Sequence, residues 1–170
     1  LTCIHAKTPA QEMKEAVDHA ITSEVVADEN PYYHLKTTPA IRKYQTPEGL
    51  PMISNRLSQT IPWNGEPARV KMTFRGSGGI APESTVQGWQ GLFFFAYFWG
   101  EQRYVPIAKE FYRSIPLSKE FNKISFEFNV PKGTKHLFLE FSLYHAAEAS
   151  LDDITLSKVT EQGLEAAVFP

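Results

Sequence analysis

Alternation of apolar and polar side chains along most of the chain is the feature that most restricts its fold. From residue 52 onward, apolar residues recur at every second position, as in Val70, Met72 and Phe74 between charged and polar neighbours. Segments rich in Gly and Pro separate these runs. A period of two places successive side chains on opposite faces of a β-strand. The sequence therefore predicts a mainly β fold, an antiparallel sandwich or barrel, and excludes a parallel sheet with crossover helices in this region.

The same pattern predicts where the strands lie. A run of four small residues, Gly76-Ser77-Gly78-Gly79, is expected to end the strand that begins at residue 68. One amphipathic helix is expected over residues 8–25, because Thr8 suits an N-cap and Pro9 suits the first turn. We predict a helical or linker segment at 1–30, a sandwich domain at 31–160 and a tail at 161–170. The expected strands are 32–36, 41–44, 55–61, 68–75, 89–99, 103–107, 110–116, 124–130, 137–144 and 152–159.

Composition removes several classes of function. The 170 residues suit one principal domain, and Lys+Arg 17 against Asp+Glu 19 gives a net charge of −2. A near-neutral balance supplies no electrostatic reason to expect nucleic acid as a partner. The single cysteine excludes an internal disulfide. Residues 84–100 carry no formal charge, but Gln and Gly interrupt their apolar run, so we expect a buried strand and no membrane span.

Aromatic residues on the strand at 89–99 point to a binding surface. If Leu92, Phe94, Ala96 and Phe98 face the core, the odd-numbered row faces away from it: Phe93, Phe95, Tyr97 and Trp99. Such a floor suits a sugar, since one face of a pyranose ring consists of C–H groups and its rim carries hydroxyls that donate and accept hydrogen bonds. Alternatively, Phe93 and Phe95 pack under a long loop or the N-terminal helix.

Polar residues on neighbouring strands complete the expected site. We predict that Tyr97 and Trp99 stack on sugar rings. The residues expected to bond the sugar hydroxyls are Arg69, Glu127, Glu140 and Tyr144, provided that their strands share the sheet of the aromatic row. Other aromatic residues that could be exposed are Trp63, Trp89, Tyr104 and Tyr112.

The order of several segments resembles carbohydrate-binding modules of the family 4/9 type, which are galactose-binding-like jelly rolls. These segments are, in order, Arg56–Pro62, Ala68–Gly76, Lys123–Thr134, Leu137–Leu143 and Ser150–Leu156, with Phe126-Glu127-Phe128-Asn129-Val130-Pro131-Lys132-Gly133-Thr134 and Leu151-Asp152-Asp153-Ile154-Thr155-Leu156 inside the third and the fifth. The resemblance covers about residues 52–159. It implies a non-catalytic module on a secreted or cell-surface protein, which binds an oligo- or polysaccharide beside a neighbouring polysaccharide-degrading domain.

The resemblance also implies a structural calcium ion with Asp152 or Asp153 as a ligand. Calcium takes six to eight oxygen ligands, so this pair cannot form a site alone. The opening strand that supplies partners in that family is not recognisable here, and Asp28-Glu29-Asn30 could replace it. The alternative is that the two aspartates only begin a strand and cap a turn.

Two other classes of function stay open. One is a structural or protein-interaction sandwich whose aromatic residues bury against a partner. The other is a jelly-roll enzyme, either a lyase with Tyr144-His145 as the base or a glycoside hydrolase with Glu127 and Glu140 as acid and base. No histidine pair has metal-binding spacing and no Gly-x-Ser-x-Gly motif occurs. The sequence therefore favours a chain without catalytic activity.

Overall fold

A computed structural model describes residues 21–26, 32–37, 54–80, 90–144, 147–160 and 165–169. Within these ranges the chain forms ten strands and no helix. The strands are β1 (Ile21–Val26), β2 (Tyr32–Thr37), β3 (Ser54–Pro62), β4 (Ala68–Ile80), β5 (Gly91–Trp99), β6 (Phe111–Ile115), β7 (Asn122–Val130), β8 (His136–Tyr144), β9 (Ala147–Val159) and β10 (Glu165–Phe169).

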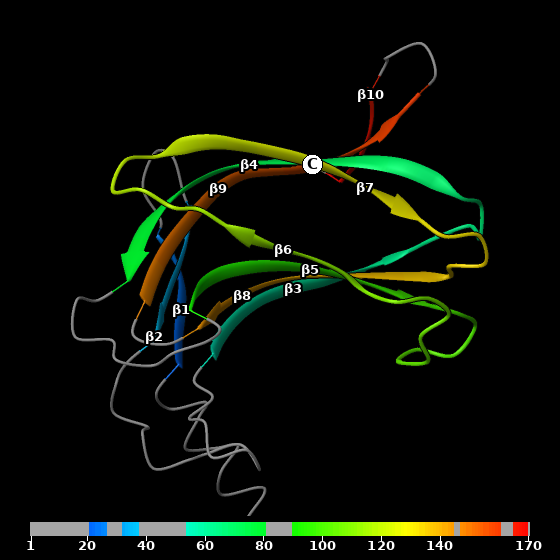
Figure 1. Ribbon diagram of the computed structural model, residues 1–170, viewed down its shortest axis with the longest axis horizontal. Coiled ribbons are helices and arrows are strands. Elements are labelled where there is room, and N and C mark those ends of the chain that lie inside the picture. The colour runs from blue at the N-terminus through cyan, green and yellow to red at the C-terminus, as the bar shows by residue number, and fades with distance from the viewer. Residues whose placement is uncertain are drawn as a thin grey trace, which may run out of the picture.

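The strands build two sheets that lie face to face as the layers of a sandwich (Figure 1). The six-stranded sheet has the order β1-β2-β9-β4-β7, with β10 also paired to β9. The four-stranded sheet has the order β3-β8-β5-β6. The strand pairs are all antiparallel. The antiparallel β-sandwich predicted from the alternation is thus confirmed.

Interlocking aromatic rings hold the two layers together. From the six-stranded sheet, β4 supplies Phe74, which is fully buried. From the four-stranded sheet, Phe141 meets it, and the centroids of Phe74 and Phe141 lie 5.0 Å apart in an edge-to-face arrangement. The rings of Phe94 and Phe141 lie 5.2 Å apart. Such pairs contribute about 0.5–1.5 kcal/mol each beyond the burial of their area, so this cluster fixes how the sheets stack.

The glycine run in β4 extends the strand, and the prediction that it ends the strand is wrong. β4 continues to Ile80 and pairs with β9 along its whole second half, where Gly78 lies opposite Ala149. A Cβ added to Gly78 would lie 2.1 Å from the backbone oxygen of Glu148, and its φ is +150°. Only glycine lets β9 approach β4 this closely.

Two other segments differ from the expected structure. Residues 21–25 lie in β1 rather than in a helix, in keeping with the β-branched Ile21, Thr22, Val25 and Val26, which favour strands. The rest of the expected helix, residues 8–20, and the expected strand at 41–44 lie outside the described residues. Residues 103–107 belong to the β5–β6 loop instead of a strand and pair with β5 at one isolated bridge, between Trp99 and Pro106. The segments assigned to a linker and a tail contribute β1 and β10 to the six-stranded sheet.

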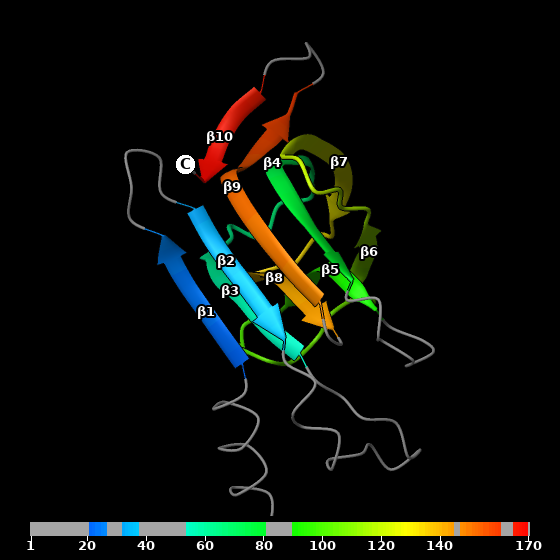
Figure 2. The ribbon, with the colours of Figure 1, turned by 90° about the vertical axis from the view of Figure 1, so that its left-hand side faces the viewer.

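β9 has an irregular stretch in the middle. β2 pairs with its first part, up to Leu151, and β10 pairs with its last part, from Leu156. Figure 2 shows β2 and β10 on the same side of β9, one beyond the other. On the opposite side, the register with β4 shifts between Thr73 and Arg75, and Asp153 there has a φ of +50°. Asp153 and Ile154 therefore form a bulge opposite Phe74, and residues 152–155 have, among the described residues, no strand partner on the other side of β9.

Candidate functional site

The outer face of the four-stranded sheet carries a group of aromatic side chains, which we call the aromatic face. Side chains of β5 alternate between the two faces of the sheet. Leu92, Phe94, Ala96 and Phe98 all belong to the core, so Phe93, Phe95, Tyr97 and Trp99 lie on the outer face. The orientation predicted for β5 is therefore confirmed. In register, Tyr97 lies beside Phe138 of β8 and Phe95 beside Tyr112 of β6. The aromatic face comprises Phe93, Phe95, Tyr97, Trp99, Tyr112, Phe138 and Tyr144.

These rings touch one another in a continuous strip along β5. The ring centroids of Phe93 lie 5.7 Å from Tyr144 and 6.4 Å from Phe95. Phe95 stacks on Tyr97 at 5.9 Å, and Tyr97 lies 5.8 Å from Phe138. Phe138 stacks on Trp99 at 4.9 Å. In Figure 1 both layers arch in the same sense, so the strip lies on the inner side of the bend of its sheet.

Exposure differs widely along the strip. Trp99 is only 7% exposed, because Phe138 covers one part of its indole and Tyr104, from the β5–β6 loop, covers another at 4.7 Å. Tyr104 itself is 74% exposed and Tyr112 is 50% exposed. Tyr97 is partly exposed and Tyr144 is buried. The rings open to a ligand are therefore Tyr112 and Tyr104, and in part Tyr97, Phe93 and Phe138, while Trp99 packs against Tyr104 and Phe138.

A polar cluster adjoins the strip. The carboxylate of Glu140 is buried and accepts a hydrogen bond from Ser142 Oγ at 2.6 Å. Arg56, on β3, places its Nη1 3.8 Å from Glu140 Oε2 and keeps about half of its side chain in solvent. Glu140 lies beside Phe95 in the sheet register, with Ser58 on its other side. The cluster therefore presents a guanidinium group at the edge of the aromatic rings.

The two tyrosines near this cluster hold their protons more firmly than an exposed tyrosine. Burial, followed by the negative charge of Glu140, raises the pKa of Tyr97 to about 12. The pKa of Tyr144 is also raised, chiefly by burial. Both hydroxyls are therefore neutral at physiological pH and can donate as well as accept hydrogen bonds.

Two residues expected at the site lie on the other sheet. Arg69 is on β4 and Glu127 on β7, where they face each other as an ion pair with 2.5 Å between Nε and Oε2. With Asn129 and Phe128 they line a hollow of about 260 Å³. The expectation that they share the surface of Tyr97 is wrong, because alternation fixes the face of a side chain but not the sheet to which its strand belongs. For the same reason Glu127 and Glu140, on different layers, do not form an acid–base pair, and His145 lies outside the described residues.

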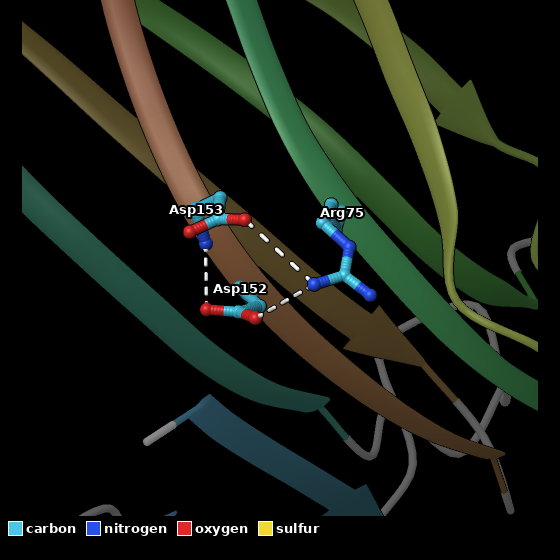
Figure 3. A network of polar contacts seen from close by, with 3 residues as sticks. All are labelled: Arg75, Asp152 and Asp153. Atoms are coloured by element: carbon cyan, nitrogen blue, oxygen red, sulfur yellow. Dashed lines mark hydrogen bonds and ion pairs between the residues drawn. The ribbon is translucent and has the colours of Figure 1, made fainter. Parts of the chain in front are cut away.

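The expected calcium ligands form an ion-pair network with Arg75. Arg75 Nη1 lies 3.5 Å from Asp152 Oδ2 and 3.8 Å from Asp153 Oδ2 (Figure 3). The backbone N–H of Asp153 donates to Asp152 Oδ1 at 2.8 Å. Among the described residues, no group of three or more His, Cys, Asp or Glu side chains could hold a metal ion. Calcium takes six to eight oxygens, more than this pair supplies, and the other ligands considered, Asp28, Glu29 and Asn30, lie outside the described ranges, so the calcium site stays a prediction.

Sequence reasoning missed two residues of this site, Arg56 and Phe138. Phe138 alternates with Leu137 and Leu139 in an entirely apolar run, so parity alone did not distinguish its surface role from a core role. Arg56 lies two strands from Tyr97, and only the order β3-β8-β5 brings it there. Tyr104 and Tyr112 were expected as exposed aromatic residues, and the structure confirms their exposure.

Comparison with known proteins shows which solved structures have a similar fold. No family model matches the chain, and no curated protein matches it. Among solved structures, the bacteriophage CBA120 tailspike protein 4 enzymatically active domain aligns with 82% of this chain, with a TM-score of 0.58 and 13% identity. This chain spans only 18% of that tailspike chain. A structure titled "CBM4 structure and function" aligns over 84% of this chain and 83% of its own, with a TM-score of 0.50 and 11% identity.

Identities this low establish the fold alone. The chain has the β-sandwich jelly-roll fold that also occurs in carbohydrate-binding modules, as the fold class predicted. The likeness does not distinguish the family 4/9 type from other modules of that fold. Within the described ranges, no helix is long and apolar enough to cross a membrane.

Proposed function

We propose that this chain is a non-catalytic carbohydrate-binding module whose aromatic face binds a glycan chain. The observation that carries the proposal is the continuous strip of rings beside a guanidinium and carboxylate cluster on an outer sheet face. Apolar C–H faces of sugar rings pack on aromatic side chains, and sugar hydroxyls pair with charged and amphipathic groups. The jelly-roll fold, shared with carbohydrate-binding modules, supports this proposal.

Each part of the strip has a distinct role in this proposal. Tyr112, Tyr97 and Tyr104 supply the ring faces, because they combine an aromatic plane with exposure. Arg56 donates to sugar hydroxyls from the edge of the strip, while Glu140 and Tyr144 hold the polar cluster in place. Trp99 positions Phe138 and Tyr104 rather than meeting the sugar with an open ring.

The wider context is also proposed. A single exposed site binds weakly, and tethering to a neighbouring catalytic or surface domain would raise the effective concentration of that domain on its polymer. We infer a secreted or cell-surface module that attaches a polysaccharide-degrading enzyme or surface protein to a glycan. The sequence resemblance to family 4/9 modules supports this assignment.

Affinity electrophoresis in gels containing galactan, xylan, mixed-linkage β-glucan or hydroxyethylcellulose tests the proposal. At least one polymer should retard the parent protein, and Tyr112→Ala and Arg56→Ala should each lose most of that retardation. The matched controls are Tyr33→Ala, a tyrosine of similar exposure on β2, and Arg69→Ala on the other sheet. Retardation of the parent by none of the polymers, or equal losses in the controls, would contradict the proposal.

One observation favours a second function, a protein-interaction domain. The β5–β6 loop exposes Val105 at 48% and Ile107 at 42%, next to the exposed Tyr104. Contiguous apolar groups of this kind occur at protein interfaces. Light scattering distinguishes the two functions: an interaction domain should form a stable complex or dimer that Val105→Ser weakens, without any response to oligosaccharides.

A further inference from the structure

A pocket of about 390 Å³ lies at the edge of the sandwich, between the two sheets, and its lining includes none of the rings of the aromatic face. It is lined by β3 and β8 of the four-stranded sheet and by β2, β4 and β9 of the six-stranded sheet. The stretch of β9 that lines it is residues 152–155, between the part of β9 that pairs with β2 and the part that pairs with β10 (Figure 2). The pocket therefore lies beside a gap between the described strands of the larger sheet.

The floor of the pocket is apolar. Met72, Leu139 and Phe141 are each at most 6% exposed and belong to the core, and the partly buried Leu57 and Ile154 form the walls. A volume of this size lies in the range of small-molecule sites, which are mostly apolar with a few placed polar groups. A thioether and an aromatic ring both make favourable contacts with another aromatic ring, so this floor suits a flat aromatic body.

Two polar side chains of the lining occupy inward positions and yet remain accessible. Gln59 of β3 lies opposite Leu139, and Tyr33 of β2 lies opposite Leu151. Both partners are core residues, and side chains that lie opposite each other in antiparallel strands share one face of the sheet. Gln59 is nevertheless exposed, and Tyr33 is 41% exposed. These two side chains therefore border the mouth of the pocket, where an amide and a phenol can donate and accept hydrogen bonds.

The charged residues of the lining do not favour an ionic ligand. Asp152 and Asp153 both contact Arg75, which follows the core residue Phe74 and so points to the outer face of the six-stranded sheet (Figure 3). These carboxylates thus already have a cationic partner on that face. Among the described lining residues there is no lysine, arginine or histidine. A charged group that entered the pocket would lose hydration without gaining an unpaired counter-ion.

From this arrangement we propose that the pocket binds an uncharged small molecule that combines an aromatic body with a hydroxyl or amide group. The aromatic body lies on Met72 and Phe141. The hydroxyl or amide group bonds to the Gln59 amide and the Tyr33 hydroxyl at the mouth. This site shares no ring with the aromatic face and does not depend on the glycan-binding proposal.

Four indoles with the same body and different heads test the proposal: tryptophol, 3-ethylindole, tryptamine and indole-3-acetate. The readout is the methyl NMR signal of Met72, assigned by Met72→Leu. Tryptophol should shift this signal with a dissociation constant at least five times lower than those of the cationic tryptamine and the anionic indole-3-acetate. No shift with millimolar tryptophol, or no preference for tryptophol over the two charged compounds, would overturn the proposal.

Two variants separate the head group from the cavity. Gln59→Leu removes the amide and keeps a side chain of similar size, so it should weaken tryptophol at least threefold without weakening 3-ethylindole. The matched control is Thr60→Val, the next residue of β3, which points to the opposite face and should change neither affinity. Ile154→Trp narrows the pocket and should weaken both ligands.

Two results would refute the parts of the proposal separately. If Gln59→Leu weakened tryptophol and 3-ethylindole equally, the contact to the head group would be refuted, even if Ile154→Trp failed to fold. If a folded Ile154→Trp bound both ligands as the parent does, the site would not be this pocket. Glycan retardation should stay at the parent level in Gln59→Leu, which keeps the outcomes of the two proposals distinct.

Discussion

We expect the side chain of Trp99 to stabilise the fold and not to stack on a sugar ring, and Trp99→Ala tests this expectation. At 7% exposure nearly all of the indole is buried. Burial of about 250 Å² of indole surface at 25 cal/mol per Å² contributes at most roughly 6 kcal/mol to the free energy of unfolding. Because the unfolded state is itself compact, the expected contribution is about 4 kcal/mol. For a chain of this size, each 1 kcal/mol lowers the melting temperature by about 2–4 °C. We therefore expect Trp99→Ala to lower the melting temperature by roughly 8–16 °C.

Circular dichroism melts of three variants provide the measurement and its controls. Trp99→Phe keeps a ring against Phe138 and Tyr104, so it should recover about half of the loss. Tyr112→Ala truncates a half-exposed ring and should cost about 1 kcal/mol while it removes glycan retardation. If Trp99→Ala melted within 2 °C of the parent protein and still lost glycan binding, the indole would be an open platform and the packing argument would be refuted.

Three further predictions concern the sheets. Gly78→Ala should cost about 2 kcal/mol in urea denaturation because its Cβ would meet the backbone of Glu148, whereas Gly79→Ala, with nothing within 4 Å, should be close to neutral. Ser142→Ala removes the donor to the buried Glu140 carboxylate and should cost about 1.5–3 kcal/mol, against a few tenths for Ser125→Ala on an exposed position. Between pH 10 and 12 the folded state keeps the Tyr97 proton that the unfolded state loses, so stability should fall by about 1 kcal/mol after allowance for solvent screening, and Tyr97→Phe should abolish that fall.

The sequence was sufficient to predict an antiparallel sandwich or barrel and to predict which face of a single strand is buried. Alternation in β5 and β7 correctly separated core from surface side chains, because one face of each strand is buried and a slip of one residue would reverse it. The same reasoning failed at Gly78, where local propensity predicted a break. The close approach of β9, which depends on a residue 70 positions away in the chain, decides the conformation there.

The composition of the candidate site could not be read from periodicity because strand order is a tertiary property. Arg69 and Glu127 have the residue types of a sugar site, yet β4 and β7 belong to the six-stranded sheet. Arg56 joins the polar cluster only because β3 pairs with β8. A pocket of about 390 Å³ lies between β3 and β9, and two features of the sequence belong to its lining: Gln59 at an inward position of β3 and the adjacent Asp152 and Asp153. Neither feature indicates a cavity until the two edges are placed together.

β9 also sets a constraint on synthesis of the chain. It is the central partner in its layer, hydrogen-bonded to β2, β4 and β10, although β2 and β4 are made long before it. At about 5–20 residues per second, a ribosome takes roughly 4 to 16 s to travel from the end of β4 to the completion of β9. During that interval one edge of each earlier strand is open to other chains. Chaperone capture of nascent chains that stop before residue 147 would be the cellular sign of this delay.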